Sequence, residues 1–201
     1  MAVRRSIGLA AVGLLLLLIA RSASSDDAVD RLSVPGPIDF NAASYRLSWS
    51  SHPSPDYYKQ EYLPAGQTSE HFERMLLVEA IARGADVSGV VAAQVDRLKR
   101  RKSTDPTVNF AIVRNPKTGE VILDFVLSEE TDKRGLIVEW NAYRYTVLKD
   151  QKGHSGVALF GISRRAYGDA STEFLRGLKA ARPAEIDALA KYPLPAVRVK
   201  D

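Results

Sequence analysis

The segment EWNAYRY (139–145) gathers aromatic, charged and amide side chains within seven residues. In a strand, alternate side chains face opposite sides, so Trp140 would join its apolar neighbours Val138 and Ala142 in the core. The other side would carry a row formed by Glu139, Asn141, Tyr143 and Tyr145. This mixture of polar and aromatic groups predicts a groove that binds a sugar, a peptide or the surface of a partner. The alternative is a cross-strand ladder half covered by a loop.

Two charged residues of an earlier strand segment, Lys59 and Glu61, are expected neighbours of this row and complete the candidate binding residues. Glu61, Asp124 and Glu139 are the acids that fall within expected strands. Glycoside hydrolases use two carboxylates held on the order of 5–10 Å apart, so these acids are the basis of an alternative function as an envelope hydrolase. The simpler interpretation of Glu61 and Glu139 is that each forms an ion pair with a basic residue on a neighbouring strand.

Other signatures of catalysis are missing from the sequence. There is no cysteine, and the three histidines stand apart without metal-ligand spacing, as is typical of solvated surface histidines. The string GHSGV (153–157) resembles a nucleophile elbow, but Val157 stands where that pattern needs glycine, and the context is strand-to-strand. No glycine-rich nucleotide-binding motif occurs. We therefore expect no metal, no cofactor and no catalytic residue, and a non-enzymatic protein rather than an enzyme.

The N-terminus has the features of a secretory signal peptide in their usual order. Arg4 and Arg5 form a short positive region, an apolar run covers 7–20, and small residues suited to cleavage follow. The apolar run is shorter than the roughly 20 residues of a membrane-spanning helix. We therefore expect a signal peptide over 1–23 and an exported, periplasmic protein. An uncleaved leader that anchors the protein in the membrane is the alternative.

The expected leader also accounts for most of the excess of basic residues. It contains three of the 28 lysines and arginines and none of the 24 acidic residues. Without it, the formal net charge falls from +4 to about +1, which lacks the basic footprint of a nucleic-acid-binding protein. The expected partner is therefore an envelope protein or a small ligand, with no nucleic acid and no membrane contact except through the leader.

The rest of the chain predicts a mobile lead-in over 24–43, followed by a single α+β domain over 44–201. Alternating apolar residues and turn signals predict strands over 44–50, 57–63, 107–113, 120–127, 135–148 and 155–165. Helical periodicity and capping residues predict helices over 69–83, 87–101 and 169–181, with Pro183 ending the last and a short helical turn after it. These strands cluster between helices without alternating with them. This order predicts an antiparallel sheet of five to six strands with helices on its faces, similar to an α/β/α sandwich.

One stretch carries a family resemblance. The stretch over 60–76 contains Gln60, Glu61, Tyr62, Leu63, Pro64 and Gly66, followed by Phe72, Met75 and Leu76. These residues resemble a motif of the Mog1/PsbP-like superfamily, in which a strand is followed by a helix. The chain is also similar to exported bacterial proteins. The resemblance would span roughly 45–182. It implies helices around an antiparallel sheet and a binding or assembly module, and it brings no catalytic residues. With the expected leader, it favours an exported, non-enzymatic binding or assembly factor.

Overall fold

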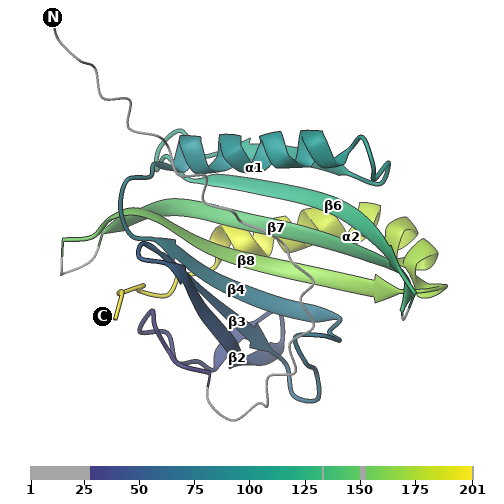
Figure 1. Ribbon diagram of the computed structural model, residues 1–201, viewed down its shortest axis with the longest axis horizontal. Coiled ribbons are helices and arrows are strands. Elements are labelled where there is room, and N and C mark those ends of the chain that lie inside the picture. The colour runs from purple at the N-terminus through teal and green to yellow at the C-terminus, as the bar shows by residue number, and fades with distance from the viewer. Residues whose placement is uncertain (1–27, 133, 150–152, 201) are drawn as a thin grey trace, which may run out of the picture.

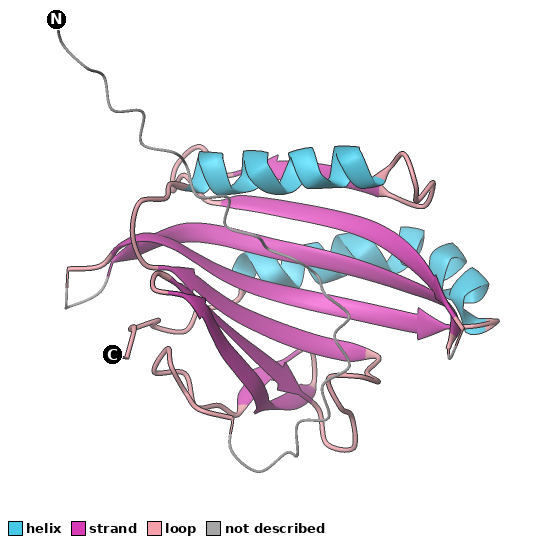
Figure 2. Ribbon diagram, in the orientation of Figure 1, coloured by secondary structure: helices cyan, strands magenta, loops and turns pink. Residues whose placement is uncertain are grey.

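The computed structural model describes residues 28–132, 134–149 and 153–200, which form an antiparallel sheet with a helix on each face (Figures 1 and 2). The expected leader over 1–23 lies outside the described residues. The strands are β1 (Ile38–Phe40), β2 (Ala43–Ser54), β3 (Tyr57–Leu63), β4 (Arg74–Ile81), β5 (Asn109–Arg114), β6 (Val121–Thr131), β7 (Gly135–Lys149) and β8 (Ser155–Tyr167). The helices are α1 (Val87–Arg101) and α2 (Ala170–Lys191).

The eight strands follow the order β1-β2-β3-β4-β8-β7-β6-β5, and every neighbouring pair is antiparallel. After β4, α1 carries the chain from the middle of the sheet to its far edge. The meander β5–β8 then returns, so that β8 pairs with β4. The α+β class and the antiparallel sheet were predicted correctly. The expected five to six strands were too few, since β1 and β4 were not anticipated.

The two helices cover different sets of alternating side chains. Val91 and Val95 of α1 pack with Leu123 and Tyr143, in a core that we call the α1 side of the sheet. Leu189 of α2 belongs to the second core, which lies on the α2 side of the sheet and contains the other alternating set of β7. Figure 1 shows β2 and β3 lying away from α1, so that helix does not extend over the whole of its face.

The segment 69–83 is the main error in the expected secondary structure. It was expected to be a helix, but it contains the central strand β4, whose interior is buried on both sides. The stretch RMLLVEAI (74–81) is almost continuously apolar, and such short runs occur in buried helices and buried strands alike. The helix that the resemblance to the Mog1/PsbP-like superfamily implies, with Phe72, Met75 and Leu76, is therefore not found here.

The described part of the expected lead-in also belongs to the domain. Leu32, Val34, Ile38 and Phe40 are buried in the core on the α2 side, so the segment 28–43 is not the mobile lead-in that we expected. The backbone N–H groups of residues 31 and 32 donate to Oε1 of Gln60, over 2.6 and 2.9 Å. These four apolar residues form two short alternating pairs, which a Pro-Gly-Pro turn separates. Each pair is too short for its alternation to predict that the segment is buried.

The helix α2 continues through Pro183, where we expected a helix to end. A proline inside a helix leaves one carbonyl without its usual N–H partner. Pro183 is exposed, so water can hydrate that carbonyl. The expected short helical turn after it is the second half of α2.

Candidate functional site

The strand β7 presents two different faces, as the alternation of EWNAYRY predicted. Trp140 lies in the core on the α2 side, 1% exposed, and this prediction is confirmed. Its indole Nε1 donates to Oδ1 of Asp124 over 3.3 Å. Trp140 is therefore a packing residue with its one polar atom satisfied.

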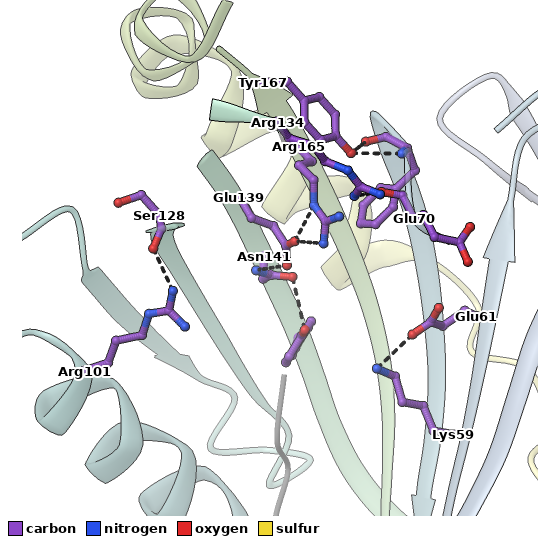
Figure 3. A network of polar contacts seen from close by, with 12 residues as sticks. Lys59, Glu61, Glu70, Arg101, Ser128, Arg134, Glu139, Asn141, Arg165 and Tyr167 are labelled. Carbon is purple, nitrogen blue, oxygen red and sulfur yellow. Dashed lines mark hydrogen bonds and ion pairs between the residues drawn. The ribbon is translucent and has the colours of Figure 1, made fainter. Parts of the chain in front are cut away.

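The opposite face of β7 carries the row Glu139, Asn141, Tyr143 and Tyr145, and all four side chains are buried. Asn141 Nδ2 donates to Glu139 Oε1 over 3.0 Å, and Tyr143 Oη donates to Asn141 Oδ1 over 3.1 Å. Figure 3 shows this chain of contacts running along the strand. Glu139, Asn141 and Tyr143 therefore form a hydrogen-bonded ladder inside the protein, and Tyr145 is buried next to it. The row does not line an accessible groove of the kind that we expected.

Arg165 on β8 completes the ladder. Its guanidinium forms a buried ion pair with Glu139, with Nε 2.8 Å from Oε2, and stacks 4.0 Å from the centre of the Phe72 ring. Burial alone would lower the pKa of Arg165, but Glu139 outweighs that effect and raises it. The basic partner that the sequence predicted for Glu139 is therefore present on the next strand.

A glycine makes room for this arrangement. A Cβ added to Gly161 on β8 would lie 2.6 Å from Cδ1 of Tyr143, which is closer than side chains can approach. The Tyr143 ring therefore lies directly across Gly161. Burial, followed by the charges of Glu139 and Glu79, raises the pKa of Tyr143 well above its ordinary value, so its hydroxyl stays protonated as a donor.

Lys59 and Glu61 lie on β3 on the same side of the sheet, but in a separate group. Lys59 Nζ is 2.9 Å from Glu61 Oε1, and their side chains are 19% and 13% exposed. The ammonium also lies 5.8 Å from the centre of the Trp49 ring, and Trp49 pairs with Glu61 across β2 and β3. We call Trp49, Lys59 and Glu61 the β3 patch. Figure 3 shows no contact between Lys59 or Glu61 and the ladder on β7.

Glu79 on β4 is a member of the site that the sequence did not reveal. It pairs with Lys59 across the strands, and its Oε2 accepts a hydrogen bond from Tyr57 Oη over 2.8 Å. Burial raises the pKa of Glu79 above its ordinary value of 4.5, although Lys59 and Tyr57 act to lower it. Because 69–83 was expected to be a helix, the sequence pattern did not predict that the Glu79 carboxylate lies beside β3.

Several polar atoms on the α1 side are buried without a hydrogen-bond partner in the described part of the chain. They are Tyr145 Oη, Ser163 Oγ, Arg165 Nη1 and Gln94 Oε1. Such atoms are rare in folded proteins, because each one costs free energy when it leaves water. On this side the described residues do not satisfy every buried donor and acceptor.

The three carboxylates of the alternative hydrolase do not form a group. Asp124 faces the α2 side, where Arg182 Nε lies 2.6 Å from its Oδ1. Glu61 and Glu139 share the other side, but the strands β4 and β8 separate them and each is paired with its own cation. This arrangement gives no support to a hydrolase built on these acids.

The histidines are placed by ring stacking and burial. His52 stacks on Tyr58 and His71 stacks on Tyr167, with ring centres 4.1 and 4.3 Å apart. His154 is buried, contrary to the expectation of a solvated side chain. Within residues 28–132, 134–149 and 153–200, no cluster of histidines and acids is arranged to hold a metal ion.

Comparison with known proteins gives one match. A protein-family model matches residues 32–194, whereas no curated protein and no solved structure matches the chain. Neither of the two described helices is long and apolar enough to cross a membrane. The resemblance to the Mog1/PsbP-like superfamily stays a prediction.

Proposed function

The chain belongs to the protein family whose model matches residues 32–194, and we propose a binding role for the sheet and the helices that this range contains. In this proposal the protein is an exported, non-enzymatic binding or assembly module. It holds an envelope protein or a small ligand against the α1 side of its sheet, at the β3 patch of Trp49, Lys59 and Glu61.

The observation that carries this proposal is the β3 patch, where an ammonium, a carboxylate and an indole ring lie together on the α1 side. The atoms Tyr145 Oη, Ser163 Oγ, Arg165 Nη1 and Gln94 Oε1 on the same side are buried, so a molecule bound at the surface does not reach them.

The β3 patch supplies the accessible part of the same face. Lys59 and Glu61 hold each other in place and remain partly exposed. Trp49 adds an aromatic surface beside the ammonium. An aromatic ring next to fixed charged groups is the usual composition of a site that recognises a polar ligand. Lys59 stays charged, because Glu61 and Glu79 raise its pKa in spite of the opposing effect of burial.

Export is the second part of the proposal, and it depends on the sequence of the leader. Arg4 and Arg5, the apolar run over 7–20 and the small residues after it have the order of a signal peptide. Mass spectrometry of the protein purified from the periplasm would test this directly. We expect a new N-terminus close to residue 24, and an intact Met1 would contradict cleavage.

The binding role can be tested by capture of cross-linked envelope components on the immobilised protein. The test variant is the double substitution Lys59→Met and Glu61→Gln, which removes both charges of the β3 patch with little change in volume. The matched control is Lys99→Met and Asp96→Asn on α1, which removes an exposed pair 4.0 Å apart. We expect the test variant alone to lose the captured component, with both variants still folded at the temperature of the assay, although the loss of Lys59 beside the buried Glu79 lowers the stability of the test variant. Equal capture by the two variants would refute the β3 patch as the binding site.

A further inference from the structure

A cavity of about 460 Å³ lies on the α2 side, between the paired ends of β7 and β8 and the tail that follows α2. Figure 1 shows this tail passing beside the β7–β8 end of the sheet to the C-terminus. The floor is formed by apolar side chains, namely Val78, Leu148, Ala158 and Phe160, and the opposite wall by Leu194, Pro195 and Val197. Its volume falls within the range of sites for small molecules.

The tail is attached at both ends of the cavity. At one end, Tyr192 stacks on Phe160 with ring centres 5.1 Å apart, and its carbonyl accepts a hydrogen bond from Arg144 over 2.9 Å. At the other end, the N–H of Arg198 donates to the carbonyl of Leu32 over 2.9 Å. Residues 193–197 therefore form a strap across the α2 side of the sheet.

The composition of the strap keeps the cavity open. Pro193 and Pro195 have no backbone N–H, and their rings fix one backbone angle each, so the strap cannot pair regularly with a strand. Leu194 and Val197 are only partly buried although they pack against the core. The strap thus lines one side of the cavity with apolar side chains opposite an apolar floor, and the space is suited to a chain of methylene groups.

The described charged residues that line the cavity are Lys149 and Arg198, and both are exposed. Lys149 follows Leu148 on β7, so its side chain belongs to the alternating set on the α1 side, and Arg198 is the cation on the side of the cavity. An apolar interior with a cation at the rim is complementary to a molecule that has an apolar body and one anionic end.

We propose that this cavity binds a free medium-chain fatty acid. The acyl chain lies between the floor at Phe160 and the strap at Leu194, and the carboxylate lies at the rim beside Arg198. This site is on the opposite side of the sheet from the β3 patch, so it does not depend on the binding role proposed above.

Calorimetric titration of the mature protein, below the critical micelle concentration of each probe, tests the proposal. The probes are decanoate, decanol, decyltrimethylammonium and a decanoyl lysophospholipid. We expect decanoate to bind most tightly, decanol more weakly and the cation not at all. Equal binding of decanoate and the cation would overturn the proposal, and tighter binding of the lysophospholipid would overturn the choice of a free acid.

Variants separate the two parts of the site. Arg198→Glu should weaken decanoate about fivefold, since an exposed ion pair contributes on the order of 1 kcal/mol, and should leave decanol unchanged. Lys179→Glu makes the same change in net charge at an exposed position that does not line the cavity, and should affect neither probe. An equal effect of the two variants on decanoate would show a non-specific charge effect and refute the site.

Filling the cavity gives an independent result. Ala158→Leu adds volume at the floor and should abolish binding of decanoate and decanol alike. If this variant does not fold, Leu194→Trp fills the cavity from the strap, where the side chain is only partly buried. Unchanged binding in a folded cavity-filling variant would place the probe elsewhere and refute the proposal.

Discussion

The two sides of the sheet are built on alternate residues of the same strands, yet they treat polar groups differently. On the α2 side, Asp124 accepts hydrogen bonds from Trp140 and Arg182. Arg164 pairs with Glu185, which extends from α2. These contacts join the helix to the sheet, so the buried charges on this side hold the architecture together.

On the α1 side, the buried charges pair within the sheet. Arg165 and Glu139 lie on adjacent strands, and Lys59 and Glu61 lie on one strand. The helix α1 covers its part of this face mainly with valines and leucine, and it carries a buried Gln94 whose Oε1 has no described partner.

The two sides also differ in the number of buried polar atoms that have no described hydrogen-bond partner. Of the six buried side-chain atoms without a partner in the described part of the chain, four lie on the α1 side: Tyr145 Oη, Ser163 Oγ, Arg165 Nη1 and Gln94 Oε1. The α2 side has an apolar cavity beneath its strap, whereas the α1 side has unused hydrogen-bonding capacity. The variants below compare the contribution of packed volume on the α2 side with that of polar pairing on the α1 side.

The largest effect is expected for Trp140→Ala on the α2 side. The side chain is fully buried beneath α2, and truncation of a buried tryptophan costs roughly 3–5 kcal/mol of the free energy of unfolding. Urea unfolding followed by circular dichroism measures this loss. Trp140→Phe keeps much of the volume and should cost clearly less. Equal losses would indicate that the hydrogen bond to Asp124, and not volume, dominates.

The matching test on the α1 side is Arg165→Met, which leaves Glu139 buried without its cation. Removing one partner of a buried ion pair costs about 3 kcal/mol or more, because a charge is left uncompensated. The double variant Arg165→Met with Glu139→Leu should recover most of the lost stability, since neither charge remains. If the double variant is less stable than Arg165→Met alone, the side chain of Glu139 stabilises this face in some other way than by pairing with Arg165.

Two tyrosines of one row allow a finer comparison. Tyr143→Phe removes a donor to the buried Asn141 Oδ1 and should cost about 1 kcal/mol. Tyr145→Phe removes a hydroxyl that has no partner in the described structure, and should change stability by less than about 0.5 kcal/mol. Chemical denaturation of both variants measures the change in the free energy of unfolding for each hydroxyl. A larger loss at Tyr145 would show that its hydroxyl is satisfied by water or a ligand.

Local patterns in the sequence were sufficient where one side of an element is polar. The bounds of α1 follow from its valine stripe and its N-cap Asp86, and they agree with the expected helix over 87–101. The strand over 57–63 and the two faces of β7 were predicted for the same reason. Two long hairpins could also be recognised, because turn residues separate their strands.

The rest depended on contacts that local patterns do not contain. β4 is buried on both sides, so its sequence has no alternation that distinguishes a strand from a helix. The position of Glu79 beside β3 could therefore not be predicted either. The burial of Glu139 and Asn141 depends on cover from distant segments, and an identical row on an edge strand would be exposed. The cavity beneath the strap depends on where Tyr192 and Arg198 attach, which no sequence motif reveals.

The smallest effect expected is a dependence of stability on pH at Glu79. Because burial raises the pKa of this carboxyl in the folded protein, the folded state holds the proton more tightly than the unfolded chain does. The stability that this proton contributes is fully present below the ordinary pKa of 4.5 and is lost as the pH rises through the raised value. Relative to Glu79→Gln, the wild type should therefore become less stable as the pH increases from 4 towards neutrality, when unfolding free energies are compared at each pH. Glu70→Gln in a loop serves as the control variant. A wild type that gains stability over Glu79→Gln with rising pH would mean that Lys59 and Tyr57 outweigh burial, and that the α1 side keeps this carboxylate charged.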